Sequence, residues 1–303
     1  ALPISGCTGG AGGGPIDCRG AENANEFTRQ IAKTIPALLG TDADVIAISE
    51  IENDGYGTGS TIERLVTEMN AVAGTGVYTY VNPDIQNGTN SLGTDAINVG
   101  ILYKPSVVMP VGNAAALNTV EFVNGGDSGP RTRPALAQTF EEIATGGKFT
   151  VVSNHFKSKG SACDSPDTGD GQGNCNDVRT AAASELLQWL ATYPTGIADD
   201  DVLILGDLNS YAMEDPILAI KGAGYIDLAY EEAGTDAYSY VFDGQWGYLD
   251  YSLASQTLAS QVALATTWHI NSDEPNVLDF NTNFKTGGRP RRSDLRLGRR
   301  PGQ

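Results

Sequence analysis

The chain has 303 residues, a hydrophobic content of 40% and a formal net charge of -18 at pH 7. That length suffices for one large hydrophobic core or two modest ones. No apolar run reaches membrane-spanning length, so we expect a soluble protein without a membrane span. The acidic body repels polyanions at long range, which excludes a chromatin-binding protein.

Hydrophobic periodicity predicts strands that alternate with helices along the chain. In chain order we expect a helix over 23–39, a strand over 44–49, a helix over 60–72, strands over 77–81, 97–103, 135–140 and 148–154, a helix over 177–190, a strand over 202–205, a short helix near Asp215-Pro216, and strands over 249–254 and 262–269. Some connections are as short as a hairpin, so mixed sheets are expected. No internal repeat and no domain linker is visible.

The charge is unevenly distributed along the chain. Residues 1–284 carry 12 basic and 36 acidic residues, whereas 285–303 carry seven basic residues and one acid. We expect one domain over 1–285 and interpret 286–303 as a non-native or frame-shifted tail. The acidic body and the start at Ala-Leu-Pro-Ile-Ser indicate a processed or fragmentary secreted protein, which we expect to be an extracellular monomer.

The four cysteines form two close pairs, each in a loop rich in Gly and Asp. Local pairing of this kind indicates disulfides in an exported protein. Zinc is the alternative, but the spacings exceed C-x₂₋₄-C and no histidine is near. We therefore predict disulfides Cys7–Cys18 and Cys163–Cys175, each worth about 3 kcal/mol in the chain-entropy description.

Four predicted strands end in, or contain, polar residues that can carry chemistry. Gly206-Asp207-Leu208-Asn209-Ser210 follows an apolar strand, and residues two apart point to the same side. Glu50 ends the strand at 44–49, His155 follows the strand at 148–154, and Asp250 lies in the strand at 249–254. Each also has a purely structural interpretation: a turn, a surface acid, a buried histidine or a backbone brace.

In this order, the acid after a strand, Asn-x-His, Gly-Asp-x-Asn and Leu-Asp-Tyr resemble the endonuclease/exonuclease/phosphatase superfamily, which has the DNase I-like fold. Ser49-Glu50-Ile51-Glu52-Asn53 and Ser153-Asn154-His155-Phe156-Lys157-Ser158-Lys159-Gly160 look closest to its bacterial extracellular nucleases. The resemblance covers residues 6 to 285. It implies an α/β (α+β) protein, a four-layer α/β/β/α sandwich of two mixed sheets.

The resemblance also implies an activity, the Mg²⁺- or Mn²⁺-dependent hydrolysis of phosphodiesters by an endonuclease or exonuclease that acts on DNA or RNA. Glu50 and Asp207 would hold the cation, and Asp207 would deprotonate the attacking water. His155 would donate a hydrogen bond to the leaving oxygen, oriented by Asp95, and Asp250 would complete the catalytic set. Substrate phosphates would be contacted by Asn154, Lys157, Lys159 and Asn209.

Two family features have no counterpart in this sequence. The family carries an Asn on its first strand, and it ends in a strand preceded by Ser-Asp-His-Asp, whose histidine pairs with the acid that Asp250 matches. Here Arg292-Ser293-Asp294-Leu295 contains no histidine, and His269 falls inside the strand predicted at 262–269. We expect a domain that lacks its first and last strands, and an impaired activity.

Two other functions remain open from the sequence. The first is a phosphomonoesterase or lipid phosphodiesterase of the same superfamily, because the site motifs are shared. The second is a non-catalytic, calcium-binding surface module. Its Ca²⁺ ligands would be oxygens from one acidic loop, namely those of Asp164, Asp167, Asp170 and Asp177.

Overall fold

The computed structural model describes residues 8–16, 21, 23–242 and 244–274. The strands are β1 (Val45–Glu52), β2 (Thr79–Tyr80), β3 (Ile97–Tyr103), β4 (Val108–Leu117), β5 (Arg133–Glu142), β6 (Lys148–His155), β7 (Val202–Asp207), β8 (Ile226–Asp227), β9 (Tyr240–Phe242), β10 (Gln245–Gly247) and β11 (Asp250–Ala254). The helices are α1 (Ala24–Thr41), α2 (Thr61–Ala73), α3 (Asp84–Asn87), α4 (Val120–Asn124), α5 (Asn176–Leu190), α6 (Asp215–Gly222), α7 (Leu228–Ala233), α8 (Gln256–Ala259) and the 3₁₀ turn Gly234–Asp236.

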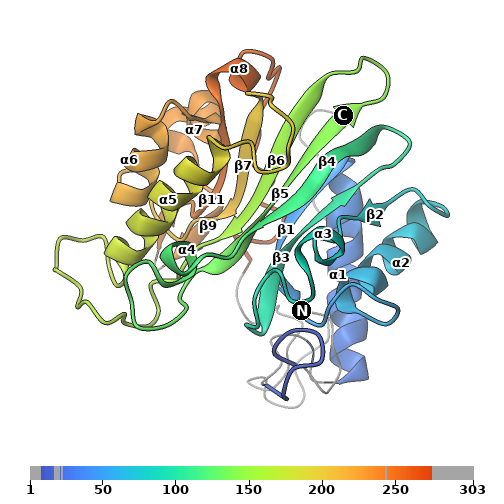
Figure 1. Ribbon diagram of the computed structural model, residues 1–303, viewed down its shortest axis with the longest axis horizontal. Helices are drawn as coiled ribbons and strands as arrows, with labels where there is room; N and C mark the ends of the chain where they lie inside the picture. Colours follow the sequence, from blue (N-terminus) through green and yellow to red (C-terminus); the bar gives the residue numbers. More distant parts are fainter. Residues whose placement is uncertain (1–7, 17–20, 22, 243, 275–303) are drawn as a thin grey trace.

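Two main sheets lie against each other between two layers of helices (Figure 1). The larger sheet has the strand order β4-β5-β6-β7-β11-β8 and is mixed, because β6 and β7 run parallel while the other neighbours are antiparallel. The smaller sheet has the order β1-β3-β2, with antiparallel pairs, and β9 and β10 form a separate hairpin. This is the expected α/β/β/α architecture.

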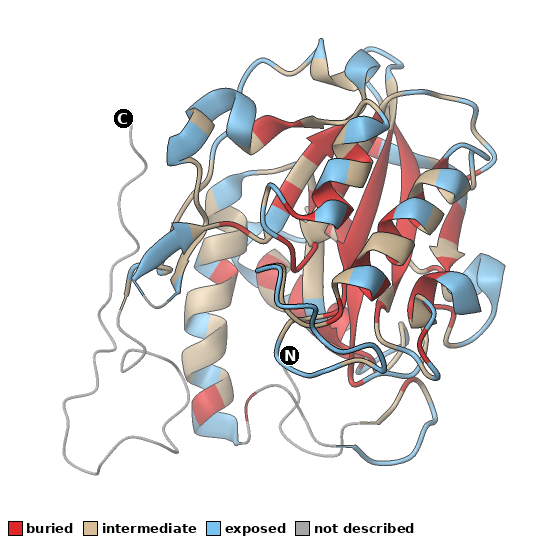
Figure 2. Ribbon diagram, turned by 90° about the vertical axis from the view of Figure 1, so that its left-hand side faces the viewer, coloured by how far each residue is buried: buried red, intermediate tan, exposed pale blue. Residues whose placement is uncertain are grey.

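Three apolar clusters separate the four layers. Val99 and Ile101 of β3 pack toward the larger sheet, whereas Leu102 of the same strand packs with the helices α1 and α2, as the two-residue period of a strand requires. On the far side, Leu186 of α5 packs on Ile204 of β7. Figure 2 shows the buried residues concentrated on the strands and on the helix faces turned toward them.

Most predicted elements are present, several short helices and strands were not predicted, and two of the longer differences can be explained. Strand β4 was not expected, because Pro110 and Gly112 interrupt its apolar pattern; it lies at the sheet edge and carries a register shift between Val111 and Ala115. A proline is tolerated at such a position. The prediction of a strand over 262–269 was wrong, since no strand forms there.

The segment after α8 packs through side chains instead of pairing with a sheet. A Cβ atom on Gly40 would lie 2.6 Å from the ring of Trp268, so the missing side chain at the end of α1 makes room for this indole. His269 stacks on Tyr238, and its Nε2 lies 2.9 Å from the carbonyl oxygen of Tyr238. Trp268 and His269 therefore pack on neighbouring elements, whereas Leu264 of the same segment is 69% exposed.

No helix in the described part of the chain is long and apolar enough to cross a membrane. The predicted Cys7–Cys18 disulfide and the basic tail at 286–303 lie outside the described residues.

Candidate active site

Strand pairing brings three of the predicted site residues side by side on the larger sheet. His155 is the register partner of Asp207 across the parallel pair β6/β7, and Asp250 is the register partner of Asp207 across the antiparallel pair β7/β11. Residues paired in this way project on the same face of a sheet. His155 Nε2 lies 3.7 Å from Asp207 Oδ2, so the structure places these three residues side by side.

The loop after β7 takes its shape from two residues of the Gly-Asp-x-Asn motif. A Cβ atom on Gly206 would lie 2.0 Å from the carbonyl oxygen of Asn154, so only glycine allows β6 and β7 to approach this closely. Asn209 has a left-handed backbone (φ 49°), which Asn tolerates better than most residues. Its backbone N–H donates to Asp207 Oδ1 at 2.8 Å, and its Nδ2 donates to the carbonyl of Phe156 at 3.0 Å.

Glu50 reaches the same place from the smaller sheet. The pairing of β1 with β3 shifts register between Ile48 and Ile51, and Glu50 lies in this bulge with φ 59°. A bulge re-aims a side chain, and a strained backbone at a non-glycine residue is typical of functional sites. Glu50 is exposed, and its charge raises the pKa values of both Asp207 and Asp250. Carboxylates from both sheets thus converge.

Burial and neighbouring carboxylates raise the pKa values of two acids in this cluster. Desolvation, followed by the charges of Asp250 and Glu50, raises the pKa of Asp207 to about 7. Desolvation and Glu50 also raise the pKa of Asp250, although part of that residue's surface remains exposed. Burial and the charge of Arg133 lower the pKa of His155 to about 4, so its imidazole is neutral at pH 7.

The carboxylates of this cluster are suitable ligands for a hard divalent cation. Within the described residues, no three His, Cys, Asp or Glu side chains are arranged to hold an ion by themselves. Mg²⁺ does not need such a cage, because it usually takes one or two carboxylates and keeps waters or substrate oxygens. Glu50 and Asp207 supply two carboxylates, and the mutual repulsion that raises the pKa of Asp207 is what a cation would relieve.

The sequence did not reveal Arg133, which lies next to His155. Arg133 is the register partner of His155 across β5 and β6, and its charge acts on both His155 and Asp207. Counting back along the predicted hairpin from Gly146-Gly147 would have paired His155 with Gln138, because the observed register is offset from that turn and shifts again between Arg133 and Leu136.

The predicted contact of Asp95 with His155 needs correction. Asp95 Oδ2 accepts from Arg133 Nε at 2.8 Å, while His155 Nδ1 is buried without a partner among the described residues. Asp95 acts on His155 through its charge alone.

The substrate contacts predicted after β6 are also arranged differently. Asn154 is fully buried and donates to the carbonyls of Val152 and Leu205, so it joins β6 to β7 and cannot touch a substrate. Lys157 Nζ donates to Ser161 Oγ at 2.9 Å within its own loop, and Lys159 Nζ pairs with Glu214. Phosphate contacts by the two lysines and by Asn209 stay predictions.

Arg179 on α5 connects the loops around the site from a fully buried position. Its Nε donates to Ser210 Oγ at 3.0 Å, directly after Asn209. Its Nη1 donates to the carbonyls of Asn174 and Lys157 at 2.6 and 3.4 Å, and Nη2 donates to the carbonyl of Gln172. One guanidinium therefore holds the segments that follow β6 and β7 against the disulfide loop.

We predict that Arg179→Met lowers the free energy of unfolding by about 3 kcal/mol, because buried carbonyl groups lose their charged donor and Glu214 loses one of its two cationic partners. Urea unfolding measures this change. Arg64→Met is the matched control: Arg64 pairs with Glu68 on the exposed face of α2, and its loss should cost less than about 1 kcal/mol. Equal losses in the two variants would contradict the bracing role of Arg179.

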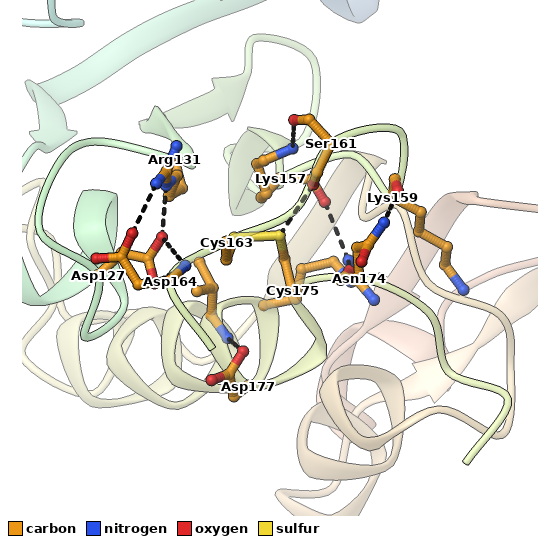
Figure 3. The surroundings of a disulfide bond; sticks show 12 residues. Asp127, Arg131, Lys157, Lys159, Ser161, Cys163, Asp164, Asn174, Cys175 and Asp177 are labelled. Atoms are coloured by element: carbon orange, nitrogen blue, oxygen red, sulfur yellow. Dashed lines mark hydrogen bonds and ion pairs between the residues drawn. A yellow bond between two sulfur atoms is a disulfide. The ribbon is translucent and has the colours of Figure 1, made fainter. Parts of the chain in front are cut away.

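The acidic loop contains the second predicted disulfide, Cys163–Cys175, which is confirmed (Figure 3). Asp164 pairs with Arg131 and accepts from the N–H of Ser128 at 2.8 Å. The other three acids accept from the backbone within their own turns: Asp167, Asp170 and Asp177. The structure does not bring these four carboxylates together, and calcium binding by this loop stays a prediction.

The sequence matches the model of the Endonuclease/Exonuclease/phosphatase family over residues 13–273. No curated protein matches it. Among solved structures, the mannosyl-6-phosphatase of Bacteroides thetaiotaomicron VPI-5482 is similar, with 15% identity and a TM-score of 0.51, over 76% of this chain and 78% of that one.

Two further solved structures are similar at the same level. A Bacteroides vulgatus endonuclease/exonuclease/phosphatase has 15% identity and a TM-score of 0.51, over 76% of this chain and 80% of that one. A family protein of Bacteroides thetaiotaomicron has 14% identity and a TM-score of 0.50, over 76% of this chain and 75% of that one. These likenesses show the DNase I-like fold.

Proposed function

Because the chain belongs to the endonuclease/exonuclease/phosphatase family of phosphoester hydrolases, we propose that it is a secreted, divalent-metal-dependent phosphodiesterase that cleaves nucleic acid, with DNA as its first substrate. The observation that carries this proposal is the convergence of Glu50, His155 and Asp207 from both sheets. The disulfide Cys163–Cys175 and the acidic composition support secretion.

The residues of the site have complementary tasks. Asp207 is fixed by the N–H of Asn209, and its carboxylate can accept a proton from water. His155 is neutral and can donate a hydrogen bond to an oxygen that gains charge. Arg133 adds a fixed positive charge beside both. A Mg²⁺ ion held by Glu50 and Asp207 would offset the negative charge of the phosphate oxygens.

Asp250 adds to the local negative charge that a cation neutralises. It is next to Asp207 in the sheet, and within the described residues no hydrogen bond or ion pair joins it to a histidine. We therefore assign Asp250 an electrostatic role, because its charge raises the pKa of Asp207.

The test compares phosphoester classes under one set of conditions. Single-stranded DNA, duplex DNA, RNA and mannose 6-phosphate are each incubated with the protein in Mg²⁺ and in EDTA. We expect strand cleavage in Mg²⁺, none in EDTA, and slower release of phosphate from the monoester. Faster release of phosphate from mannose 6-phosphate than cleavage of any strand would contradict the proposal and favour a phosphomonoesterase.

A further inference from the structure

Two tyrosine hydroxyl groups meet at the surface, at the same end of the larger sheet as the carboxylate cluster. The hydroxyl oxygens of Tyr211 and Tyr240 lie 2.8 Å apart. Tyr211 is 37% exposed and Tyr240 is partly exposed, so the pair is open to solvent. Because a hydroxyl group both donates and accepts hydrogen bonds, such a pair can recognise a polar ligand.

The segment that carries Tyr211 runs beside the segment that leads into β11. Asp207 and Asp250 are register partners in the sheet, and the N–H of Leu208 donates to the carbonyl of Leu249 at 2.8 Å. The two segments therefore stay together beyond the end of β7, and Tyr211 follows three residues after Leu208. This arrangement places Tyr211 just beyond the strand ends that carry the carboxylates.

Gly247 brings Tyr240 to Tyr211. Gly247 is the register partner of Tyr240 in the β9–β10 hairpin. A Cβ atom on Gly247 would lie 2.7 Å from the ring of Tyr211, so the absence of a side chain lets this ring pack against the hairpin. Desolvation and the hydrogen bond to Tyr211 raise the pKa of Tyr240, and the charges of Asp207 and Asp250 add to this rise. The hydroxyl of Tyr240 is therefore protonated at neutral pH and lies within electrostatic range of both carboxylates.

The side chain of Tyr211 is held in a fixed position. The preceding residue, Ser210, accepts from Arg179 Nε through its Oγ at 3.0 Å and from the Tyr251 hydroxyl through its carbonyl at 2.9 Å. Lys159 Nζ lies 4.6 Å from the centroid of the Tyr211 ring, within the range of a cation–π contact. Because the hydroxyl is already positioned, little entropy is lost when it binds a ligand.

One donor of the pair is free for a ligand. Each tyrosine hydroxyl has one O–H donor, and the contact between Tyr211 and Tyr240 uses only one of the two. Among the described residues, neither hydroxyl has a further hydrogen-bond partner. The remaining O–H can therefore donate to an oxygen acceptor from outside the protein.

The neighbouring cations are already paired, which favours hydroxyl donors for a phosphate. Lys159 pairs with Glu214, and Arg133 pairs with Asp95. A phosphodiester carries one negative charge, shared by two non-bridging oxygens that accept hydrogen bonds. A hydrogen bond to an ionised acceptor is stronger than one between neutral groups, so an O–H donor suffices to bind such an oxygen.

We propose that the hydroxyl groups of Tyr211 and Tyr240 form a donor pair that binds a non-bridging oxygen of the phosphodiester under attack. The proposal rests on the proposed function and adds two substrate-binding residues to it. Phenylalanine keeps the ring of either residue and removes the hydroxyl alone. A phosphodiester should therefore bind more weakly to either phenylalanine variant, and its cleavage once bound should change little.

The test measures hydrolysis of bis(p-nitrophenyl) phosphate in Mg²⁺, because this compound contains a phosphodiester and no second phosphate. Tyr211→Phe and Tyr240→Phe should each raise KM by at least about tenfold, the loss expected for a hydrogen bond to a charged acceptor. The kcat should stay within about twofold, since the hydrogen bond is made to the bound substrate and to the transition state alike. The double variant should lose less than the product of the two single losses, because the hydroxyls are bonded to each other.

Tyr193→Phe is the matched control, because it removes a hydroxyl far from the carboxylates. The Tyr193 hydroxyl donates to Asp200 Oδ1 at 2.7 Å, and Asp200 lies at the opposite end of β7 from Asp207. The loss of this hydroxyl should leave both KM and kcat unchanged.

Binding is also measured without turnover, by NMR of isotope-labelled tyrosine rings while dimethyl phosphate is added in Mg²⁺. Methoxide is a poor leaving group, so this diester is not consumed during the titration. The ring signals of Tyr211 and Tyr240, assigned through the two phenylalanine variants, should move. The ring signal of Tyr193 should stay in place.

Several results would overturn the donor pair. These are an unchanged KM in both Tyr211→Phe and Tyr240→Phe, a fall in kcat with KM unchanged, a rise in KM of equal size in Tyr193→Phe, or ring signals of Tyr211 and Tyr240 that do not respond to dimethyl phosphate. Absence of any hydrolysis in Mg²⁺ would instead contradict the proposed function. The titration with dimethyl phosphate would then still decide on the donor pair, because it needs no turnover.

Discussion

Asp207→Asn is expected to lower kcat for phosphodiester cleavage by about 10²–10⁴-fold, because asparagine cannot take a proton from water. The substitution keeps the shape of the side chain and the amide oxygen that can accept from the N–H of Asn209, so the loop after β7 should stay in place. Initial rates on single-stranded DNA in Mg²⁺ measure the effect, and circular dichroism verifies the fold.

The same variant is expected to be more stable than the wild type in EDTA at pH 8. The pKa of Asp207 is raised from 3.8 to about 7, so its ionisation opposes folding increasingly as the pH rises from 4 to 7. The shift limits this cost to about 4 kcal/mol, and asparagine removes it. Melting temperatures at pH 5 and pH 8 should show the advantage of the variant growing with pH.

Asp201→Asn is the control for both measurements. Asp201 comes directly before β7, at the opposite end from Asp207, and accepts from Gln261 Nε2 at 2.6 Å. It should change neither the cleavage rate nor the pH dependence of stability. A loss of activity as large as that of Asp207→Asn would show that any acid near β7 matters, which contradicts a specific role.

Glu50→Gln is expected to raise the Mg²⁺ concentration needed for half-maximal cleavage by at least about tenfold, since an amide is a poorer ligand for a hard cation than a carboxylate. It should also reduce the rise in melting temperature that Mg²⁺ gives the wild type, because a ligand stabilises the folded state according to its affinity. Activity titrations and thermal melts in Mg²⁺ provide the two readouts.

The matched control for Glu50 is Glu68→Gln, which removes a carboxylate that pairs with Arg64 on α2. We expect its Mg²⁺ dependence to equal that of the wild type. An unchanged Mg²⁺ titration in Glu50→Gln would show that the cation is held elsewhere.

The geometry of the candidate site could be predicted from the sequence to a large extent, because its residues follow strands. An apolar run such as Val202–Leu205 indicates where the core strand ends. The residues that follow must then lie at the end of that strand. Because β6 and β7 are neighbours in the sheet, their register brings His155 and Asp207 together at these strand ends, as expected. The bulge that contains Glu50 was not predictable, because it depends on pairing with β3.

The remaining features depend on tertiary contacts that leave no local pattern. Arg133 and Arg179 act through partners distant in the sequence, Asp95 and Ser210. Asn154 was expected at the substrate, but its amide satisfies two carbonyls inside the sheet. The apolar run at 262–265 suggested a strand, but no strand forms over 262–269, where Trp268 packs at Gly40 and His269 stacks on Tyr238.

The most direct test of the account is the position of a bound cation in crystals soaked in Mn²⁺, located by its anomalous scattering. We predict one strong peak in contact with the carboxylates of Glu50 and Asp207, and its loss in Glu50→Gln. A peak in the acidic loop between Asp164 and Asp177, with the carboxylates of Glu50 and Asp207 unoccupied, would contradict a metal-dependent active site at the junction of the two sheets.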